Sequence, residues 1–160
     1  MRYDPAVHHR RSLRLSFYDY SQVGAYFVTV CTWNRELLLE SKAVRDAVQV
    51  AWEGLPSRFP DVALDDFVVM PNHVHVLLTP RVPLEKITRV LKGYSAREAN
   101  RILERVGRRF WQTESYDHWI RSEESFSRIV RYIEWNPVSA GLVRRPEDWP
   151  WSSAWSGARS

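Results

Sequence analysis

Two histidines separated by one residue have a spacing that is suited to binding a metal ion. His73 and His75 follow a Pro71-Asn72 pair and stand at the start of an apolar run. On a β-strand, side chains two positions apart point to the same face, with Cα atoms roughly 6–7 Å apart, whereas a helix would splay them. An extended segment would therefore let both imidazoles bind one metal ion. Two strand histidines can also be half-buried and simply hydrogen-bonded, and spacing alone leaves that alternative open.

A second pair of residues has the spacing of neighbours on one helix surface. Tyr132 and Asn136 are four residues apart in an amphipathic segment. The amide oxygen of Asn136 is an acceptable ligand for a hard divalent ion. Two imidazoles and one amide would leave coordination positions open for a phosphate oxygen, and a tyrosine one turn away could attack the phosphorus. The alternative is a core tyrosine followed by an asparagine that ends the helix before Pro137.

Hydrophobic periodicity predicts the elements that would position these residues. The predicted strands cover residues 24–33, 62–70 and 73–79, and Pro71-Asn72 is typical of a tight hairpin turn. The predicted helices cover residues 41–55, 83–107 and 122–136, with short extended segments at 110–112 and 116–120. The order β-α-β-β-α-β-α predicts an α+β fold, with a ferredoxin-like antiparallel β-sheet flanked by helices.

Two details of these elements are further expectations. Both faces of the first strand, residues 24–33, are largely apolar, so we expect both to be covered. The histidine pair should lie on a central strand. Because Pro137 disfavours helical geometry at the residue before it, we expect the last helix to end at Asn136.

Composition limits the class of protein and its partners. The chain has 160 residues, 44% of them hydrophobic, which fits one domain over residues 1–160 with an N-terminal arm (1–20) and a C-terminal tail (138–160). The 23 Lys+Arg outnumber the 19 Asp+Glu, and a net charge of +4 is compatible with a polyanionic partner. The candidate contacts to DNA phosphates are Lys92, Arg97, Arg101 and Arg128, although isolated basic side chains are often only solvated.

Aromatic and cysteine content adds further limits. Most of the eight tryptophans should lie in the core, while some could stack on unpaired bases. The single cysteine, Cys31, excludes a disulfide framework and a thiolate zinc site. No apolar run approaches a membrane span, and the N-terminus has no apolar signal-peptide core. We therefore expect a soluble cytoplasmic protein without a membrane partner.

Several motifs occur together in an order that resembles one family. The segment Val69-Met70-Pro71-Asn72-His73-Val74-His75-Val76-Leu77 is similar to the HUH motif (histidine, hydrophobic, histidine) of small single-tyrosine transposases. More narrowly, the chain resembles the REP-associated tyrosine transposases over nearly its whole length. Ser115 departs from their pattern, in which an aromatic residue is more usual. The other matching motifs are Tyr18-Asp19-Tyr20-Ser21, Gly24-Ala25-Tyr26-Phe27-Val28-Thr29, Leu91-Lys92-Gly93, Phe110-Trp111-Gln112, Tyr116-Asp117-His118, Ile120-Arg121, Tyr132-Ile133, Asn136-Pro137-Val138, Ala140-Gly141-Leu142-Val143 and Trp149-Pro150-Trp151-Ser152-Ser153.

The resemblance implies an antiparallel sheet flanked by helices that acts on single-stranded DNA around short palindromic hairpins. In this family a tyrosine attacks a DNA phosphate, which gives a 5′-phosphotyrosine link and a free 3′-hydroxyl, and a 3′-hydroxyl later resolves the link. By motif, His73 and His75 are the ligands of a divalent ion (Mg²⁺ or Mn²⁺), Tyr132 is the nucleophile and Asn136 is a possible third ligand. The resemblance favours a monomer, with a dimer possible.

Three alternatives remain open at this stage. Tyr116, beside Asp117 and His118 in an extended segment, is the second candidate for the nucleophile, and His118 could lie near the site. A ferredoxin-like sheet with a basic helix could instead be a nucleic-acid-binding module without catalysis. A structural metal site on an unrelated scaffold is the third possibility, and it would leave no open coordination position.

Overall fold

Four strands build one antiparallel sheet at the centre of the fold. A computed structural model describes residues 24–157, and the expected arm at residues 1–20 lies outside them. The strands are β1 (Ala25–Cys31), β2 (Ala63–Val69), β3 (His73–Thr79) and β4 (Tyr116–Ile120). Their order is β2-β3-β1-β4, and each neighbouring pair is antiparallel. The histidine pair therefore lies on a central strand, as predicted.

The tight turn at Pro71-Asn72 fixes where the histidines stand in the sheet. β3 pairs with β1 so that His75 lies opposite Thr29 and His73 lies opposite Cys31. Directly opposite residues of an antiparallel pair project from the same face of the sheet. The antiparallel β2–β3 pair confirms the predicted hairpin, and the register of β1 against β3 brings both imidazoles to one face together with the hydroxyl of Thr29.

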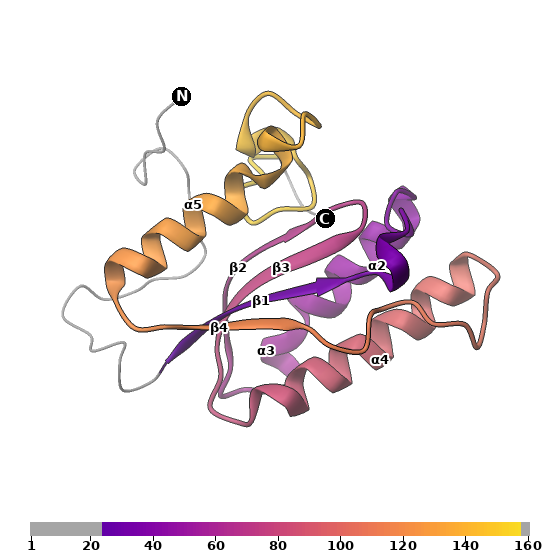
Figure 1. Cartoon of the computed structure of the whole chain (residues 1–160), viewed down its shortest axis with the longest axis horizontal. Helices are drawn as coiled ribbons and strands as arrows, with labels where there is room; N and C mark the ends of the chain where they lie inside the picture. The colour runs from indigo at the N-terminus through magenta and orange to yellow at the C-terminus, as the bar shows by residue number, and fades with distance from the viewer. Residues whose placement is uncertain (1–23, 158–160) are drawn as a thin grey trace.

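Helices cover the two faces of the sheet unequally. α2 (Lys42–Glu53), α3 (Leu55–Arg58) and α4 (Leu84–Ile102) lie on one side, and α5 (Glu123–Ser139) crosses the other side (Figure 1). The three-helix side holds a closely packed core that includes Val28, Val30, Val74, Val76, Trp52 and Leu91. The α+β prediction is thus confirmed. None of the helices between residues 24 and 157 has both the length and the apolar character needed to cross a bilayer.

The face of the sheet under α5 is only partly covered. Phe27, Thr29 and Cys31 of β1 line an open cleft on that face. The expectation that both faces of the first strand are covered therefore holds fully for the three-helix side and only in part for the α5 side, where Phe27 is buried but Thr29 and Cys31 are half-buried.

α5 continues past the point where the sequence predicts its end. It spans Glu123–Ser139, with Pro137 inside its last turn. Proline removes one N–H donor from the helix, but the turn is closed beyond it by the Ala140 N–H, which donates to the Asn136 carbonyl at 3.0 Å. The predicted end at Asn136 is wrong, and so is the alternative in which Asn136 ends the helix. Asn136 instead shares a continuous helical surface with Tyr132.

α4 ends earlier than predicted. The helix stops at Ile102, and Glu104 then adopts a left-handed φ of 55°, which reverses the chain. The Arg105 N–H donates to the Asn100 carbonyl at 2.8 Å, so a carbonyl at the helix end is satisfied without a further turn. The predicted continuation to residue 107 is wrong, and Val106 is exposed.

The C-terminal segment belongs to the core and is more than a loop-like tail. The Trp149 Nε1–H donates to the Val69 carbonyl at 3.0 Å, and the Val69 N–H donates to the Trp151 carbonyl at 2.8 Å. Both tryptophans are 8% exposed, and the Arg45 guanidinium stacks 3.9 Å from a ring centroid of Trp151. Trp149 and Trp151 therefore stabilise the fold and are not free to stack on bases.

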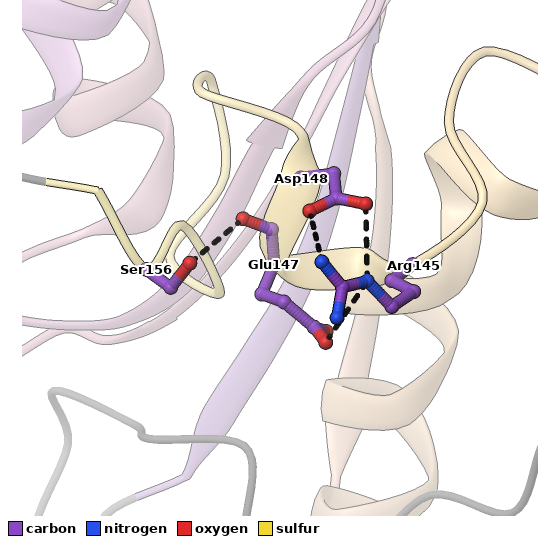
Figure 2. A network of polar contacts seen from close by, with 4 residues as sticks. All are labelled: Arg145, Glu147, Asp148 and Ser156. Carbon is purple, nitrogen blue, oxygen red and sulfur yellow. Dashed lines mark hydrogen bonds and ion pairs between the residues drawn. The ribbon is translucent and has the colours of Figure 1, made fainter.

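A polar network at the surface fixes the turn that leads into these tryptophans (Figure 2). Beside η2 (Pro146–Asp148), Arg145 donates to both carboxylate oxygens of Asp148 at 3.2 and 3.1 Å. The Ser156 hydroxyl donates to the Glu147 carbonyl at 3.3 Å, which joins the two ends of this segment. Hydrogen bonding to Asp148 raises the pKa of Arg145. Exposed pairs of this kind stabilise weakly, so their effect is mainly geometric.

Candidate active site

A cleft of about 580 Å³ lies between α5 and the partly covered face of the sheet. The floor is formed by β1 and β3, one wall by α5, and the other wall by β4 and the segment before it. The residues that line it are Phe27, Thr29, Cys31, Arg35, His73, His75, Gln112, Glu114, Tyr116, Tyr132 and Asn136. All four residues predicted for the chemistry therefore line one cleft.

The two histidines lie edge to face on the floor of the cleft, with ring centroids 4.6 Å apart. His75 is 5% exposed, and its Nδ1 lies 2.8 Å from the Thr29 hydroxyl. His73 has its Nδ1 2.7 Å from Asn72 Oδ1 and its Nε2 3.3 Å from Asn136 Oδ1. Each ring is thus held at Nδ1 by a neighbouring side chain, which fixes its orientation.

α5 presents the tyrosine and the asparagine to this floor. The Ser122 hydroxyl caps the helix by accepting from the Ser125 N–H at 3.1 Å, and the apolar stripe Phe126, Val130 and Ile133 is buried against the sheet. Tyr132 stands at the edge of that stripe and is 52% exposed. Its ring centroid is 5.4 Å from that of His75 and 5.9 Å from that of Phe27. The phenol thus lies beside the histidines at the open side of the cleft.

Burial keeps both imidazoles neutral near pH 7. Desolvation, and then the charge of His73, lower the pKa of His75 to about 3. Desolvation also lowers the pKa of His73, with a smaller contribution from the positive charge of Arg35, while the contact with Asn136 opposes the shift. A neutral imidazole has a lone pair for a metal ion, whereas an imidazolium has none.

The metal-free protein is expected to lose stability as pH falls from about 6.5 toward 3. The unfolded chain protonates His75 near pH 6.5, whereas the folded chain resists this until about pH 3, so the unfolded state binds more protons between these values. His75 should therefore lower the free energy of unfolding by roughly 1 kcal/mol for each pH unit in the middle of that window. Urea unfolding of chelator-treated protein at pH 7, 6 and 5 measures this. His75→Gln should have a shallower pH dependence, and an equally steep one would contradict the assignment.

The donor atoms in the cleft fit a divalent ion. Within residues 24–157, no three His, Cys, Asp or Glu side chains are grouped to hold a metal, so a site here needs the Asn136 amide beside the two imidazoles. A neutral His73 donates from only one ring nitrogen, yet both of its nitrogens face amide oxygens, at 2.7 and 3.3 Å. A cation near the Nε2 of His73 and the Oδ1 of Asn136 would satisfy both lone pairs.

The four predicted DNA contacts lie in different places. Arg128 is on α5, one turn before Tyr132, and donates to the Ser125 hydroxyl at 3.1 Å. Lys92, Arg97 and Arg101 are on α4, on the opposite side of the sheet from α5 (Figure 1). The Lys92 ammonium donates to the carbonyls of Gln112 and Thr113 at 2.6 and 2.9 Å, so it also ties the wall of the cleft to α4. The contact of these four side chains with DNA phosphates remains a prediction.

Tyr116 lines the same cleft and remains the second candidate for the nucleophile. It lies opposite Thr29 in the β1–β4 pair, is 59% exposed, and has its ring centroid 6.4 Å from that of Phe27. The two tyrosines thus contact the same phenylalanine ring from β4 and from α5. His118 lines a separate hollow with Trp119, Arg121 and Ser125.

Sequence reasoning did not select Thr29, Arg35 or Asn72 for the site. Alternation along the first strand could have placed Thr29 beside the histidines, once the strand pairing was known. Asn72 was used only as a turn residue, and Arg35 has no local signal because its place in the cleft depends on contacts with the distant hairpin loop.

A family model for IS200-like transposases matches residues 21–136 of the chain. The chain belongs to the IS200-like transposase family. The transposase is 31% identical to an uncharacterized protein of Haemophilus influenzae, over 86% of this chain and 93% of the relative. It is 26% identical to the REP-associated tyrosine transposase of Escherichia coli K12, over 84% of this chain and 78% of the relative. Family membership favours the transposase interpretation over a non-catalytic module.

A solved structure shares the fold of this transposase. It is the structure of a REP-associated tyrosine transposase bound to a REP hairpin. The two chains match with a TM-score of 0.66 and 22% identity, over 93% of each. The likeness covers most of the chain, in agreement with the predicted fold class.

Proposed function

We propose that this protein cleaves and rejoins single-stranded DNA through a 5′-phosphotyrosine intermediate on Tyr132. The observation that carries the proposal is the position of Tyr132 in one cleft with His73, His75 and Asn136, its ring centroid 5.4 Å from that of His75. Membership of the IS200-like transposase family supports DNA as the substrate.

The chemistry balances without a nucleotide cofactor. The Tyr132 oxygen forms a bond to phosphorus, the bond from phosphorus to the 3′-oxygen breaks, and that oxygen takes up a proton while the phenol loses one. The products are a 5′-phosphotyrosine and a free 3′-hydroxyl, so the energy of the phosphodiester is conserved in the covalent link. Attack by a 3′-hydroxyl on the same phosphorus reverses the step, releases the tyrosine and rejoins the strand.

His73, His75 and Asn136 are the residues that would hold a divalent ion. When bound, such an ion would polarise the phosphodiester and stabilise negative charge on its oxygens. This activation of the phosphate is needed because a phenol, with a pKa near 10, is little ionised at neutral pH and is a weak nucleophile. Two imidazole donors shift the preference from Mg²⁺ toward Mn²⁺. Thr29 and Asn72 fix the orientation of the two rings, and the Phe27 ring stacks on the imidazole of His75 with centroids 5.2 Å apart.

A covalent-adduct assay tests the proposed function. A 5′-labelled and a 3′-labelled DNA strand, each carrying the palindromic repeats that flank the gene with single-stranded arms, are incubated with the protein and Mn²⁺ and resolved by denaturing electrophoresis. Only the 3′-labelled fragment should migrate with the protein, because the tyrosine retains the 5′-phosphate. The 5′-labelled fragment should end in a 3′-hydroxyl that a polymerase extends. Binding without either product would favour the non-catalytic module.

Binding should prefer hairpin or single-stranded DNA over plain duplex and should weaken as salt rises. The similar transposase bound to a REP hairpin and the positive charge of this chain support the expectation. Each phosphate neutralised adds roughly 0.7 to 0.9 to the slope of log affinity against log salt. Titrations of a hairpin, a scrambled single strand and a duplex at several salt concentrations measure this. Equal affinities with parallel slopes would leave only nonspecific electrostatic binding.

A further inference from the structure

A turn at one end of the cleft holds two consecutive residues in the left-handed backbone conformation. Asn34 and Arg35, in η1 (Trp33–Arg35), have φ values of 54° and 55°. This conformation is unfavourable for residues with a side chain, and strained positions of this kind gather where a function requires them. Arg35 lines the cleft with His73 and Tyr132 and brings a positive charge to it.

Hydrogen bonds within the turn, and one to the loop before His73, hold this conformation in place. Thr32, which is fully buried, donates its N–H to the Asn72 carbonyl at 3.0 Å and its hydroxyl to the Glu36 carbonyl at 2.6 Å. The Arg35 N–H donates to the Thr32 carbonyl at 3.0 Å. The position of Arg35 is therefore coupled to the loop that precedes His73.

The Asn72 side chain connects the same turn to the His73 ring. Its Nδ2 donates to the Arg35 carbonyl at 3.4 Å, and its Oδ1 lies 2.7 Å from His73 Nδ1. A carbonyl can only accept, so the amide nitrogen must face Arg35 and the amide oxygen must face the histidine. His73 Nδ1 therefore carries the proton and donates it, which leaves the lone pair on Nε2, the atom that faces Asn136.

We propose that Arg35 contacts the DNA phosphate that Tyr132 attacks, and that Asn72 is the positioning residue that fixes both Arg35 and the His73 ring. This inference rests on the proposed function. A guanidinium can donate two parallel N–H bonds to phosphate oxygens, a match that an ammonium lacks. The Asn72 amide would thus hold Arg35, on the phosphate-binding side of the cleft, at a fixed position relative to His73, on its metal-binding side.

Binding of a modified DNA tests the role of Arg35. Tyr132→Phe protein is titrated with the hairpin strand used for cleavage, which carries either an ordinary phosphate or an uncharged methylphosphonate at the position that the unsubstituted protein cuts. Adding Arg35→Ala should weaken binding to the ordinary strand about tenfold or more and should change binding to the methylphosphonate strand less than about threefold. Arg35→Lys should recover only part of the loss, and Arg81→Ala, a matched change at an exposed arginine, should alter neither.

Two outcomes separate the inference from the proposed function. Equal losses of affinity on both strands with Arg35→Ala would overturn the role of Arg35, while cleavage by the unsubstituted protein would still support the proposed function. A complete lack of adduct with the unsubstituted protein would refute the proposed function and the inference together.

Substitutions of Asn72 separate its two contacts. Asn72→Asp keeps an oxygen to accept from His73 Nδ1 but loses the donor to the Arg35 carbonyl, whereas Asn72→Ala loses both. Titration of Mn²⁺ followed by electron paramagnetic resonance should find affinity lowered about 10- to 100-fold by Asn72→Ala and nearly retained by Asn72→Asp. Asn72→Asp should nevertheless lose discrimination between the two DNA strands, as Arg35→Ala does. Wild-type discrimination in folded Asn72→Asp protein would overturn the positioning role, even if Asn72→Ala fails to fold.

Discussion

Tyr132→Phe is expected to abolish DNA cleavage and the covalent adduct while DNA affinity stays within several-fold of the wild type. The change removes the nucleophilic oxygen and keeps the ring, so the contacts with His75 and Phe27, at 5.4 and 5.9 Å between centroids, can persist. Loss of a covalent nucleophile typically costs more than about 1,000-fold in rate. Denaturing electrophoresis of the labelled hairpin strand measures the adduct, and a filter-binding titration measures the affinity.

Tyr116→Phe is the matched control, because it makes the same chemical change on the opposite wall of the same cleft. Both phenols are largely exposed, and both rings contact Phe27. The control should form the adduct at a rate close to that of the wild type. An adduct that survives Tyr132→Phe and disappears in Tyr116→Phe would show that Tyr116, on β4, is the nucleophile.

The parts of the site that depend on local spacing could be predicted from the sequence. The i, i+2 spacing of His73 and His75 needs only an extended chain, and the Pro71-Asn72 turn marks where that chain starts. The i, i+4 spacing of Tyr132 and Asn136 needs only a helix. The contact between the two pairs could not be predicted from spacing. His73 Nε2 and Asn136 Oδ1 lie 3.3 Å apart, although the two residues are 63 positions apart in the sequence. Spacing cannot specify such a contact, and only the resemblance to a family indicated it.

Helix ends were predicted less well, because tertiary contacts override local preference. Pro137 disfavours a helix at the residue before it, yet Pro137 is buried on α5 and the helix continues to Ser139. On α4, the left-handed Glu104 ends the helix, although no glycine or proline stands there. Neither end has a reliable signal in a single sequence. Trp149 and Trp151 lie in the core, as expected for most of the tryptophans, but their partners there could not be predicted because their segment has no periodicity.

The basic residues illustrate a further limit of sequence reasoning. Arg97 and Arg101 are among the predicted phosphate contacts, but they lie on α4, across the sheet from α5, which carries Tyr132 (Figure 1). Arg101 also pairs with Glu98 at 2.9 Å. Arg35, which was not selected, lines the cleft. Periodicity predicts which side chains share one face of a helix, but it does not predict on which side of the sheet that helix packs.

Removing either histidine, or chelating divalent ions, is expected to remove cleavage. His73→Ala and His75→Ala should each lower the rate more than about 100-fold, because each takes away one of two imidazoles that converge at 4.6 Å. Asn136→Ala should be milder, at about tenfold, since a water molecule can replace one amide ligand. His118→Ala is the matched control, because His118 lines a separate hollow.

Adding metal back to chelator-treated protein is the second part of this cleavage experiment. Wild-type protein treated with chelator should regain cleavage when excess Mn²⁺ is added, whereas His73→Ala and His75→Ala should not, even though the variants still bind the hairpin strand. This combination separates loss of the metal site from loss of DNA binding or of folding. Full cleavage in the presence of chelator, or in the double variant, would show that the two imidazoles serve the fold through their hydrogen bonds to Thr29 and Asn72 and hold no metal.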